Sequence, residues 1–281
     1  MEYIRTLTRE LETGDRVELD FEGRSGTVAV RGEDTSRVRI EVVARLWADD
    51  DMEADEQAEL IARGIKHEGP RVSVRAPTLL RPHPLLFFGR SPRIDYQISV
   101  PRRTGATVKN RSGRCEIEHI EGPVEIDARS GRVLLRDVRG NVHVVSRSGS
   151  VQAESLGGVI DIESRSGSVR LADCAGALKV QSRSGSVQIE EPGADVRAQA
   201  NSGSVRYDGD VRGSIEIEVE SGSIKLSVNP DTVFFLDAES AHGSVRSDLP
   251  LRNSGAAKPP SDSSPHVRLR ARSGSIYIGP R

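Results

Sequence analysis

"SRSGSVQAESLGGVIDIESRSGSVRLADCAGALKVQSRSGSV" (Ser146–Val187) contains the hexapeptide SRSGSV three times, and the copies begin 18 residues apart. Ser-Gly pairs continue outward from this stretch with the same spacing, and a further pair follows after 19 residues. A fixed spacing of this kind is the sequence signature of a repeat architecture. The pairs begin at Ser112, Ser130, Ser148, Ser166, Ser184, Ser202 and Ser221.

Glycines nine residues apart divide each 18-residue unit into two nonapeptides. The residues two and four positions after each Gly are apolar in nine successive nonapeptides, and the residue between them is polar in all but one. Alternation with a period of two predicts a short strand with one buried face. We expect Gly to supply the positive φ of the corner between strands. The glycines are Gly113, Gly122, Gly131, Gly140, Gly149, Gly158, Gly167, Gly176 and Gly185.

A strand and a corner in every nonapeptide predict an all-β protein, and within that class a parallel β-helix (solenoid) with coils of about 18 residues, each made of two nonapeptides. A β-sandwich also has short strands, but it does not keep an unbroken nine-residue register. We assign residues 110–281 to the β-helix, with a flexible insertion near 251–266, where Pro and Ser gather. The pattern leaves the handedness of the coil open.

Residues 1–109 are less regular and are predicted to form a β-rich cap with one short helix near 52–63. Asp50 and Glu53 form a capping box at the start of this helix, and Gly64 lies near its end. Strand ends of a solenoid need covering, and an irregular segment at one end is suited to that role.

The charge balance and the first residues of the chain bear on where the protein acts. The formal net charge is −2, which provides no global field for nucleic acid or anionic membranes. The sequence lacks the run of about 18 apolar residues that a transmembrane helix needs, and its start lacks the apolar core of a signal peptide. We therefore expect a cytoplasmic protein with no transmembrane segment and no specific nucleic-acid partner, associated with the envelope only through a partner.

Residues that bind metals or form disulfides do not cluster in the sequence. Cys115 and Cys174 fall in apolar columns, which predicts small core residues rather than a disulfide framework. Calcium-binding nonapeptides need a Gly-Gly-x-Gly-x-Asp pattern, which the repeats do not have. The six histidines are scattered. We predict no metal site, no cofactor and no catalytic residue.

A column of arginines is the first candidate site. Arg stands two residues before Gly in alternate nonapeptides, where the other nonapeptides have an apolar residue, so we expect one charged and one apolar corner. Stacking at about 4.8 Å per coil would make a ladder about 20 Å long. The ladder is either a site for a polyanion, such as an acidic glycan or a phosphate polymer, or a solvated corner that repels edge pairing. Its members are Arg111, Arg129, Arg147, Arg165 and Arg183.

The Pro-rich loop near 76–93 is the second candidate, because it carries six large apolar residues. A cluster of this kind contacts a partner protein, a second copy of the chain or a membrane, or it folds back over an open end of the core. These alternatives stay open. The residues are Leu79, Leu80, Leu85, Leu86, Phe87 and Phe88.

Charged residues three positions after Gly form a further row. Glu125, His143, Asp161 and Lys179 nearly alternate in sign, so we interpret them as ion pairs between neighbouring strands on the surface. A catalytic His143–Asp161 pair is the alternative interpretation.

The repeats resemble the bacterial "putative adhesin" β-strand-repeat family, a family of unknown function. The resemblance is carried by a strand that ends in Ser99-Val100-Pro101 and by the x-S-G-x-[VI]-x-[IVL] units that follow it. It covers roughly residues 94–226, with weaker echoes at 16–32, which contains Arg24-Ser25-Gly26, and at 267–279. It implies a β-helix and an association with cell envelopes, and it supplies no catalytic residue and no ligand.

We expect a non-enzymatic structural or binding scaffold whose partner is an unidentified protein or a polyanion. One alternative is a polysaccharide-processing β-helix enzyme, but such enzymes need long loops over acid and base groups, and the coils leave little room for loops. The other alternative is a self-assembling filament or homo-oligomer module. It depends on the apolar loop and on a bare strand edge at Ser275–Gly279.

Overall fold

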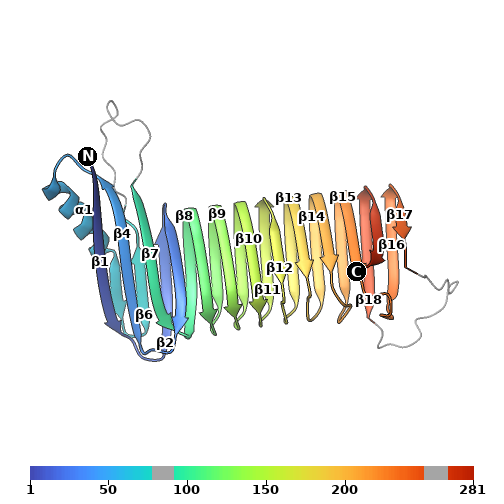
Figure 1. The fold of residues 1–281 in the computed structure, drawn as a ribbon, viewed down its shortest axis with the longest axis horizontal. Helices are drawn as coiled ribbons and strands as arrows, with labels where there is room; N and C mark the ends of the chain where they lie inside the picture. The colour runs from blue at the N-terminus through green and yellow to red at the C-terminus, as the bar shows by residue number, and fades with distance from the viewer. Residues whose placement is uncertain (78–91, 250–264) are drawn as a thin grey trace. The chain divides into compact units, whose positions relative to one another are not determined.

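The computed structural model describes residues 1–77, 92–249 and 265–281. The described chain is all-β apart from one helix (Figure 1), and it divides into two compact units, Met1–Gly140 and Asn141–Arg281. The six apolar residues of the predicted loop lie outside the described residues, as does most of the predicted insertion.

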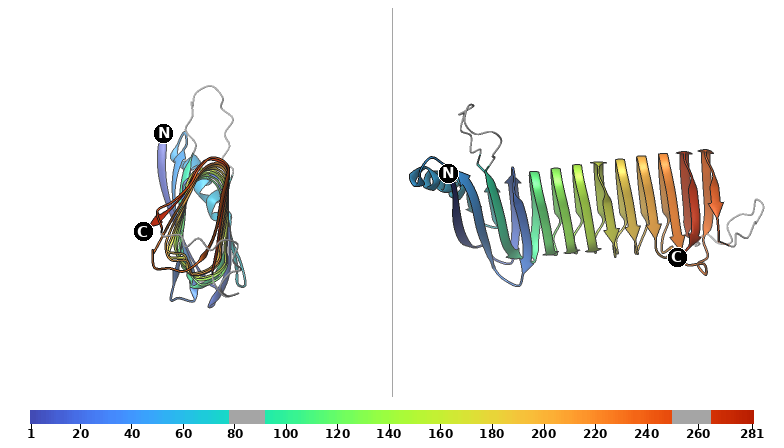
Figure 2. Two further views of the ribbon diagram at one scale, coloured as in Figure 1. Left: turned by 90° about the vertical axis from the view of Figure 1, so that its right-hand side faces the viewer. Right: turned by 45° about the horizontal axis from the view of Figure 1, so that its top comes forward.

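The second unit contains the stretch that was quoted first. Its strands pair in parallel, and each residue lies opposite the one 18 positions further along: Ile162 pairs with Val180, and Val180 pairs with Ala198. One sequence repeat is therefore one step of a solenoid-like stack, as Figure 2 shows. The strands are β10 (Val142–Leu156), β11 (Ile160–Ser166), β12 (Val169–Ala172), β13 (Leu178–Glu190), β14 (Val196–Asp208), β15 (Ile215–Val228), β16 (Phe235–His242), β17 (Val245–Ser247), β18 (His266–Ser273) and β19 (Ile276–Pro280).

The core of this unit is made of aliphatic columns, as the alternation predicts. Ile160 and Ile162 are fully buried, whereas Asp161 between them is partly exposed. Because equivalent residues of successive coils have the same parity, each apolar column continues from one coil to the next.

Glycine is required at the Ser-Gly corner for two reasons. Gly167 has a φ of 123° and Gly185 a φ of 129°, in the region that L-residues avoid. A Cβ atom on Gly167 would also lie 1.7 Å from the carbonyl oxygen of Gly149, and one on Gly185 would lie 1.9 Å from that of Gly167. At this corner the prediction that Gly supplies the positive φ is confirmed.

At the other corner that prediction is wrong. Gly176 does not have a positive φ; it is needed because a Cβ there would lie 2.0 Å from the carbonyl oxygen of Gly158. The left-handed conformation falls instead on a column of residues that are not glycine. These residues are His119, Asp137, Ser155, Asp173 and Glu191.

Ser155 provides a test of this corner, because its φ is 58° and its side chain is exposed. Replacing it with Gly removes the left-handed strain of about 1–2 kcal/mol and adds chain entropy in the unfolded state, about 0.5–1 kcal/mol. We expect Ser155→Gly to leave stability unchanged or to raise it by about 1 kcal/mol. Urea unfolding measures the change, and Ser155→Val is the control that should destabilise. A clear loss of stability in the Gly variant would contradict the assignment.

The last coils of the second unit do not stack in sequence order. β15 pairs in parallel with β18 and β19, which bring Ile276 beside Ile224, and β19 then pairs with β17, which brings Val245 beside Ile276. The strands of the final repeat, β18 and β19, therefore lie between β15 and the two strands that precede them in sequence, β16 and β17 (Figure 1). The predicted bare edge at Ser275–Gly279 is therefore wrong: Ile276 is buried between two strands.

Within its described residues, the first unit contains α1 and nine strands. β8 and β9 continue the 18-residue spacing, with Ala106 opposite Val124. The elements are β1 (Glu2–Glu12), β2 (Arg16–Gly23), β3 (Thr27–Glu33), β4 (Arg37–Trp47), α1 (Asp51–Arg63), β5 (Ile65–Glu68), β6 (Arg71–Arg75), β7 (Arg93–Pro101), β8 (Arg103–Ile120) and β9 (Val124–Val138).

Part of the predicted cap is a regular coil. β2 lies between β8 and β6, so that Leu19 has Ala106 on one side and Val72 on the other, and β3 lies between β8 and β7 in the same way. Residues 16–33 are therefore more regular than predicted. Antiparallel pairs, β7 with β4 and β4 with β1, complete the unit. β1 goes unpredicted, because much of its length is exposed and its apolar pattern is weak.

The predicted helix is present as α1. The Asp50 carboxylate accepts a hydrogen bond from the Glu53 backbone N–H at 2.8 Å, and the Glu53 carboxylate accepts one from the Asp49 N–H. Ala54 and Ile61 are buried, where α1 packs against β1 and β4. The helix thus covers apolar surface at the antiparallel part of the unit.

Candidate functional site

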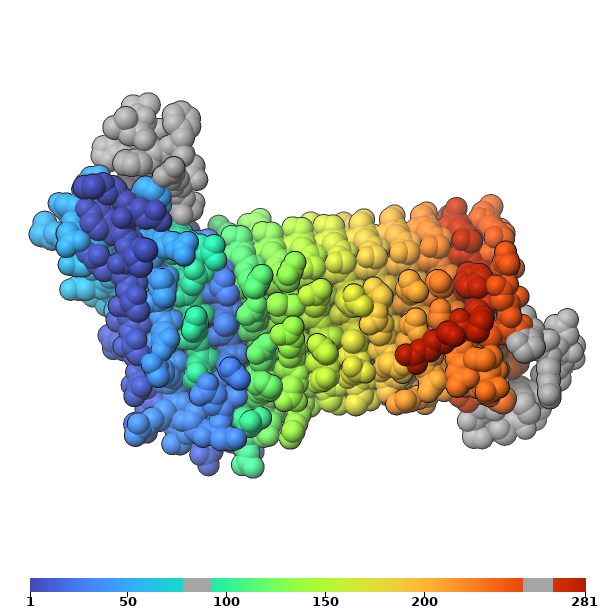
Figure 3. All heavy atoms as spheres, viewed as in Figure 1, coloured from blue at the N-terminus to red at the C-terminus, as the bar shows by residue number. Residues whose placement is uncertain are grey.

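The arginine column is ordered by the parallel register of β10, β11 and β13. The flanking serines pair directly, Ser146 with Ser164 and Ser164 with Ser182, so the intervening Arg147, Arg165 and Arg183 stack at the strand spacing of about 4.8 Å. All three arginines are exposed. Figure 3 shows successive coils of this unit as parallel bands of side chains.

These three guanidinium groups form no ion pair with any described residue. The neighbouring outward row behaves differently: Lys179 pairs with Asp161 at 3.2 Å, and Arg197 pairs with Glu216 at 2.5 Å. One carboxylate, Glu163, lies on the same outward face two residues before Arg165 and makes no ion pair with a described residue. At Arg147, Arg165 and Arg183 the corner therefore carries positive charge that is not paired within the described part of the chain.

The serine next to Gly has a structural role that links neighbouring coils. The Ser166 hydroxyl donates to the Arg147 carbonyl at 3.2 Å, and the Ser112 hydroxyl donates to the Arg24 carbonyl at 3.1 Å. In both cases the acceptor belongs to the adjacent coil rather than to the local backbone. These bonds hold the backbone at Arg24 and at Arg147.

The first unit has its own part of the column. Pairing of Gly23 with Asn110 and of Thr27 with Arg114 places Arg24 beside Arg111, and the β8–β9 register places Arg111 beside Arg129. Arg24 was missed as a member of the ladder, although it stands in the same Arg-Ser-Gly motif. The motif itself was the signal that identifies it.

The opposite corner is apolar, as predicted from the same position of the other nonapeptides. The residues that occupy it are buried, in contrast to the exposed arginines. They are Ile120, Val138, Leu156 and Cys174.

The arginine column changes after Arg183. In the following coils its place is taken by Asn201, Glu220 and Arg272, as the Ser202–Ser221–Ser273 register shows. A shallow groove of about 340 Å³ lies here, and it mixes acidic, basic and amide groups. Its lining is Gln199, Ala200, Asn201, Glu218, Val219, Glu220, Arg270 and Arg272.

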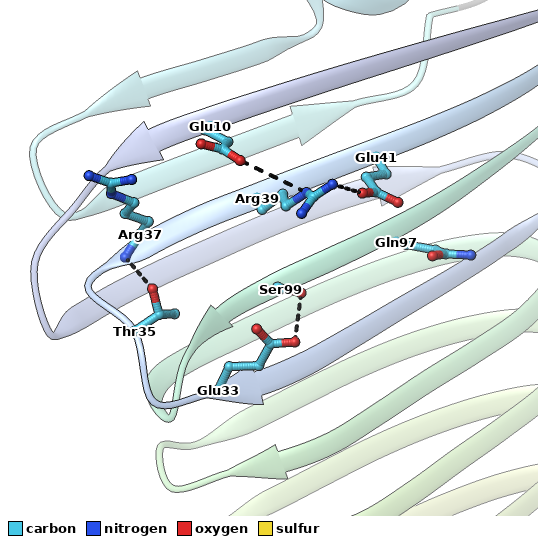
Figure 4. A pocket seen from close by; sticks show the side chains of 8 residues that line it. All are labelled: Glu10, Glu33, Thr35, Arg37, Arg39, Glu41, Gln97 and Ser99. Carbon is cyan, nitrogen blue, oxygen red and sulfur yellow. Dashed lines mark hydrogen bonds and ion pairs between the residues drawn. The ribbon is translucent and has the colours of Figure 1, made fainter.

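A second groove, of about 270 Å³, lies in the first unit (Figure 4). Its charged groups are matched within the protein: Arg39 lies 2.5 Å from Glu41 and 4.0 Å from Glu10, and the Ser99 hydroxyl donates to Glu33. Internal pairing leaves less charge for a ligand here than at the arginine column.

His143 and Asp161 form a surface pair. The His143 Nδ1 atom lies 4.0 Å from an Asp161 carboxylate oxygen, and the same oxygen lies 3.2 Å from the Lys179 ammonium. Both side chains are partly exposed in a row of charged residues, which agrees with the interpretation as surface pairing.

The two cysteines are core residues, as predicted. Burial raises the pKa of the Cys115 thiol to about 12 and that of the Cys174 thiol to about 11. Because the thiolate is the nucleophile and the metal ligand, thiols with such pKa values are unsuited to either role near neutral pH.

In the part of the chain that the structure describes, no three residues of the types His, Cys, Asp and Glu are grouped to hold a metal ion. Over the same ranges no helix combines the length and the apolar character that crossing a bilayer requires.

A buried serine column was missed by the sequence analysis. Ser146, Ser164 and Ser182, the first residues of the three hexapeptides, are at most 5% exposed, and their hydroxyls have no hydrogen-bond partner among the described residues. Their parity with the buried Val and Ile residues of the same strands was the signal that places them inside.

The chain is similar to one protein family and to several solved structures. The family profile described as "Toastrack DUF4097" matches residues 17–278. A solved structure titled as a "putative adhesin" from Bacteroides fragilis is 14% identical, with 99% of this chain and 97% of that chain covered and a TM-score of 0.44. A "putative lipid binding protein" from Parabacteroides distasonis is 12% identical, with coverages of 98% and 96% and a TM-score of 0.38. A search of curated proteins found no match.

Proposed function

The chain belongs to the Toastrack DUF4097 family, and we propose that it is a non-enzymatic binding scaffold whose exposed arginine column holds an extended polyanion. In this proposal each 18-residue unit is one coil of a parallel β-helix, made of two nonapeptides. The strand ladder then sets the spacing of the cations.

One observation carries the proposal: Arg147, Arg165 and Arg183 are stacked in register and exposed, and no described carboxylate pairs with them. Like charges about 4.8 Å apart repel by about 0.9 kcal/mol per pair in water. A ligand with a negative charge in each repeating unit relieves this repulsion, whereas a neutral ligand does not.

The ligand class follows from the spacing and the chemistry of the corner. Each coil offers one guanidinium group, a planar donor suited to carboxylates, sulfates and phosphates, and the serines after Gly add hydroxyl groups. An acidic glycan or a phosphate polymer, laid along the stack with one charge per coil, meets these donors in order. The strand ladder, with the Ser166 bond to the Arg147 carbonyl, holds the backbone of the array in advance, which lowers the ordering cost of binding.

The short corners favour binding over catalysis. In β13, which carries Arg183, and in β14 the chain passes through the Ser-Gly corner without leaving the strand, so these strands insert no loop at the corner. An enzyme that cleaves a polymer places acid and base groups around the scissile bond. The described column presents arginine and serine instead.

The test compares the parent with a variant in which Arg147, Arg165 and Arg183 are all replaced by Ser. The matched control replaces Arg170, Lys179 and Arg197 by Ser. It removes the same amount of positive charge from the same unit, but the cations that it removes are ion-paired. Each protein is titrated with heparin and with inorganic polyphosphate.

We expect the column variant to bind about tenfold or more weakly, which corresponds to about 1.4 kcal/mol, and the control to bind nearly as the parent does. Affinity of the parent should fall steeply with salt, because exposed charges are screened beyond about 8–10 Å. A parent that binds neither polymer, or two variants that lose affinity equally, would show that the column is architecture alone.

A further inference from the structure

The outermost coil of the second unit has a strand edge that no described strand pairs with. Among the described residues, β16 is registered against β18 alone, and β17 against β19 alone (Figure 1). Every strand from β11 to β15 has a parallel neighbour on both sides in this unit. β16 therefore differs from those strands, because the backbone N–H and C=O groups along one of its edges face no described strand.

The covered side of β16 shows what kind of strand fits it. β18 reads HVRLRARS and alternates apolar with basic residues. Val267 and Leu269 pair in register with Leu236 and Ala238 on the core side. On the outward side, Arg270 binds Asp237 at 2.7 Å and Glu239 at 2.9 Å, so the acidic strand is matched to a basic–apolar neighbour.

The side of this coil that faces away from β18 and β19 also presents backbone N–H groups and apolar surface. The Phe235 N–H donates to Pro265 at the start of β18, and N–H groups along a strand alternate in direction. The N–H groups of Leu236, Ala238 and Ser240 therefore point away from β18. Val245, in the same coil, is 45% exposed, although its column is buried in the coils beneath.

The acidic residues of β16 hold cations on one side only. Elsewhere in the unit a carboxylate lies between cations of two coils: Glu216 pairs with Arg197 at 2.5 Å and lies 3.9 Å from Arg268. Asp237 and Glu239 pair with β18 arginines alone among the described residues, and the Glu239 side chain remains 69% exposed.

We propose that the open edge of β16 is a docking surface for an extended strand of a partner protein in which apolar and basic residues alternate. The partner strand pairs with the N–H and C=O groups that point away from β18. Its apolar residues cover Leu236 and Ala238, and its basic residues meet Asp237 and Glu239. This surface is separate from the arginine column and does not depend on the polyanion proposal.

Pairing with a second copy of the same edge is disfavoured by charge. When two β16 strands pair antiparallel with their core faces on the same side, registers that centre on residues 237–239 place acidic residues of one copy directly opposite acidic residues of the other. Like charges directly opposite one another destabilise a strand pair. A basic–apolar partner strand avoids this repulsion.

The experiment uses the full chain and a fluorescent peptide with the sequence HVRLRARS, which reproduces the β18 pattern. The peptide HVELEARS is the charge-reversed control. Ala238→Lys places an inward charge at the open edge, a natural block of edge pairing, and Ala238→Pro removes the N–H that points outward. Ala175→Lys, at an exposed corner of the same unit, is the control for added charge.

We expect HVRLRARS to bind the parent and the Ala175→Lys variant. Binding should weaken at least about tenfold, or about 1.4 kcal/mol, with HVELEARS or with either Ala238 variant. Hydrogen exchange should show new protection at Leu236, Ala238 and Ser240. Thermal melts establish that the variants are folded, and the exchange pattern on the parent stands without them.

Four results would overturn the proposal. They are no binding of HVRLRARS to the parent, equal binding of the two peptides, binding that appears only after residues 250–264 are replaced by a Gly-Ser segment, and a dimer of the parent that Ala238→Lys dissociates. The third would assign the edge to the chain's own segment, and the fourth to a second copy. None of these four results would involve a change in the affinity of the protein for heparin, because the edge of β16 is separate from the arginine column.

Discussion

Replacement of Gly167 by Val is expected to destabilise the second unit by more than about 3 kcal/mol. Two effects add. A β-branched residue is strained at the φ of 123°, and its Cβ would lie 1.7 Å from the Gly149 carbonyl oxygen, which is backbone and can move only if the coils separate. The loss is measured as a shift in the urea midpoint, followed by circular dichroism.

Gly69 separates the two effects. Its φ is also positive, at 58°, but nothing lies within 4 Å of an added Cβ. Gly69→Val therefore carries the conformational strain, about 1–2 kcal/mol, without the collision between coils. If Gly167→Val proved no more harmful than Gly69→Val, close stacking of the Ser-Gly corners would not be what makes glycine necessary.

Ile162→Asp is expected to prevent folding of the second unit or to cost at least about 4 kcal/mol. Ile162 is fully buried in a column between Val144 and Val180, where a carboxylate finds neither water nor a cation. Its protonated form would still leave polar groups without partners in an apolar column. Circular dichroism and size-exclusion chromatography would report the loss of the folded unit.

Asp161→Ile is the matched control, one residue away on the other face. It removes the pairs with Lys179 and His143, which are worth about 1 kcal/mol or less at the surface. Asp161 Oδ1 has no hydrogen-bond partner to lose. We expect a folded but less soluble protein. If the two substitutions lowered the stability by similar amounts, the assignment of alternate residues to the core and to the surface would be wrong.

The repeat by itself determined the all-β class, the 18-residue step and the faces of the strands. It could do so because these features are local: parity decides which residues are buried, as at Ile162 and Asp161. The contrast with the apolar residues at the same position of the other nonapeptides predicted that Arg147, Arg165 and Arg183 lie at a charged corner. Whether those arginines meet carboxylates depends on the neighbouring coil, so the absence of a described partner was visible only in three dimensions.

Only the tertiary structure decided which coils are neighbours at the two ends of the repeats. β3 follows the Arg-Ser-Gly copy that ends in Gly26, and it pairs with β8. β19 follows the copy that ends in Gly274, and it pairs with β15, although β16 and β17 are closer to β15 in sequence. The corner glycine does not choose between these coils, because a Cβ would meet the backbone of the adjacent coil at both, 1.6 Å from the Gly222 oxygen at Gly274 and 1.8 Å from the Gly274 oxygen at Gly243. The physical reason is that strand pairing joins residues far apart in the chain. A strand can pair with any coil that fits it, wherever that coil lies in the chain. Chain order therefore does not predict which coils are neighbours, and β16 is the strand left with the open edge.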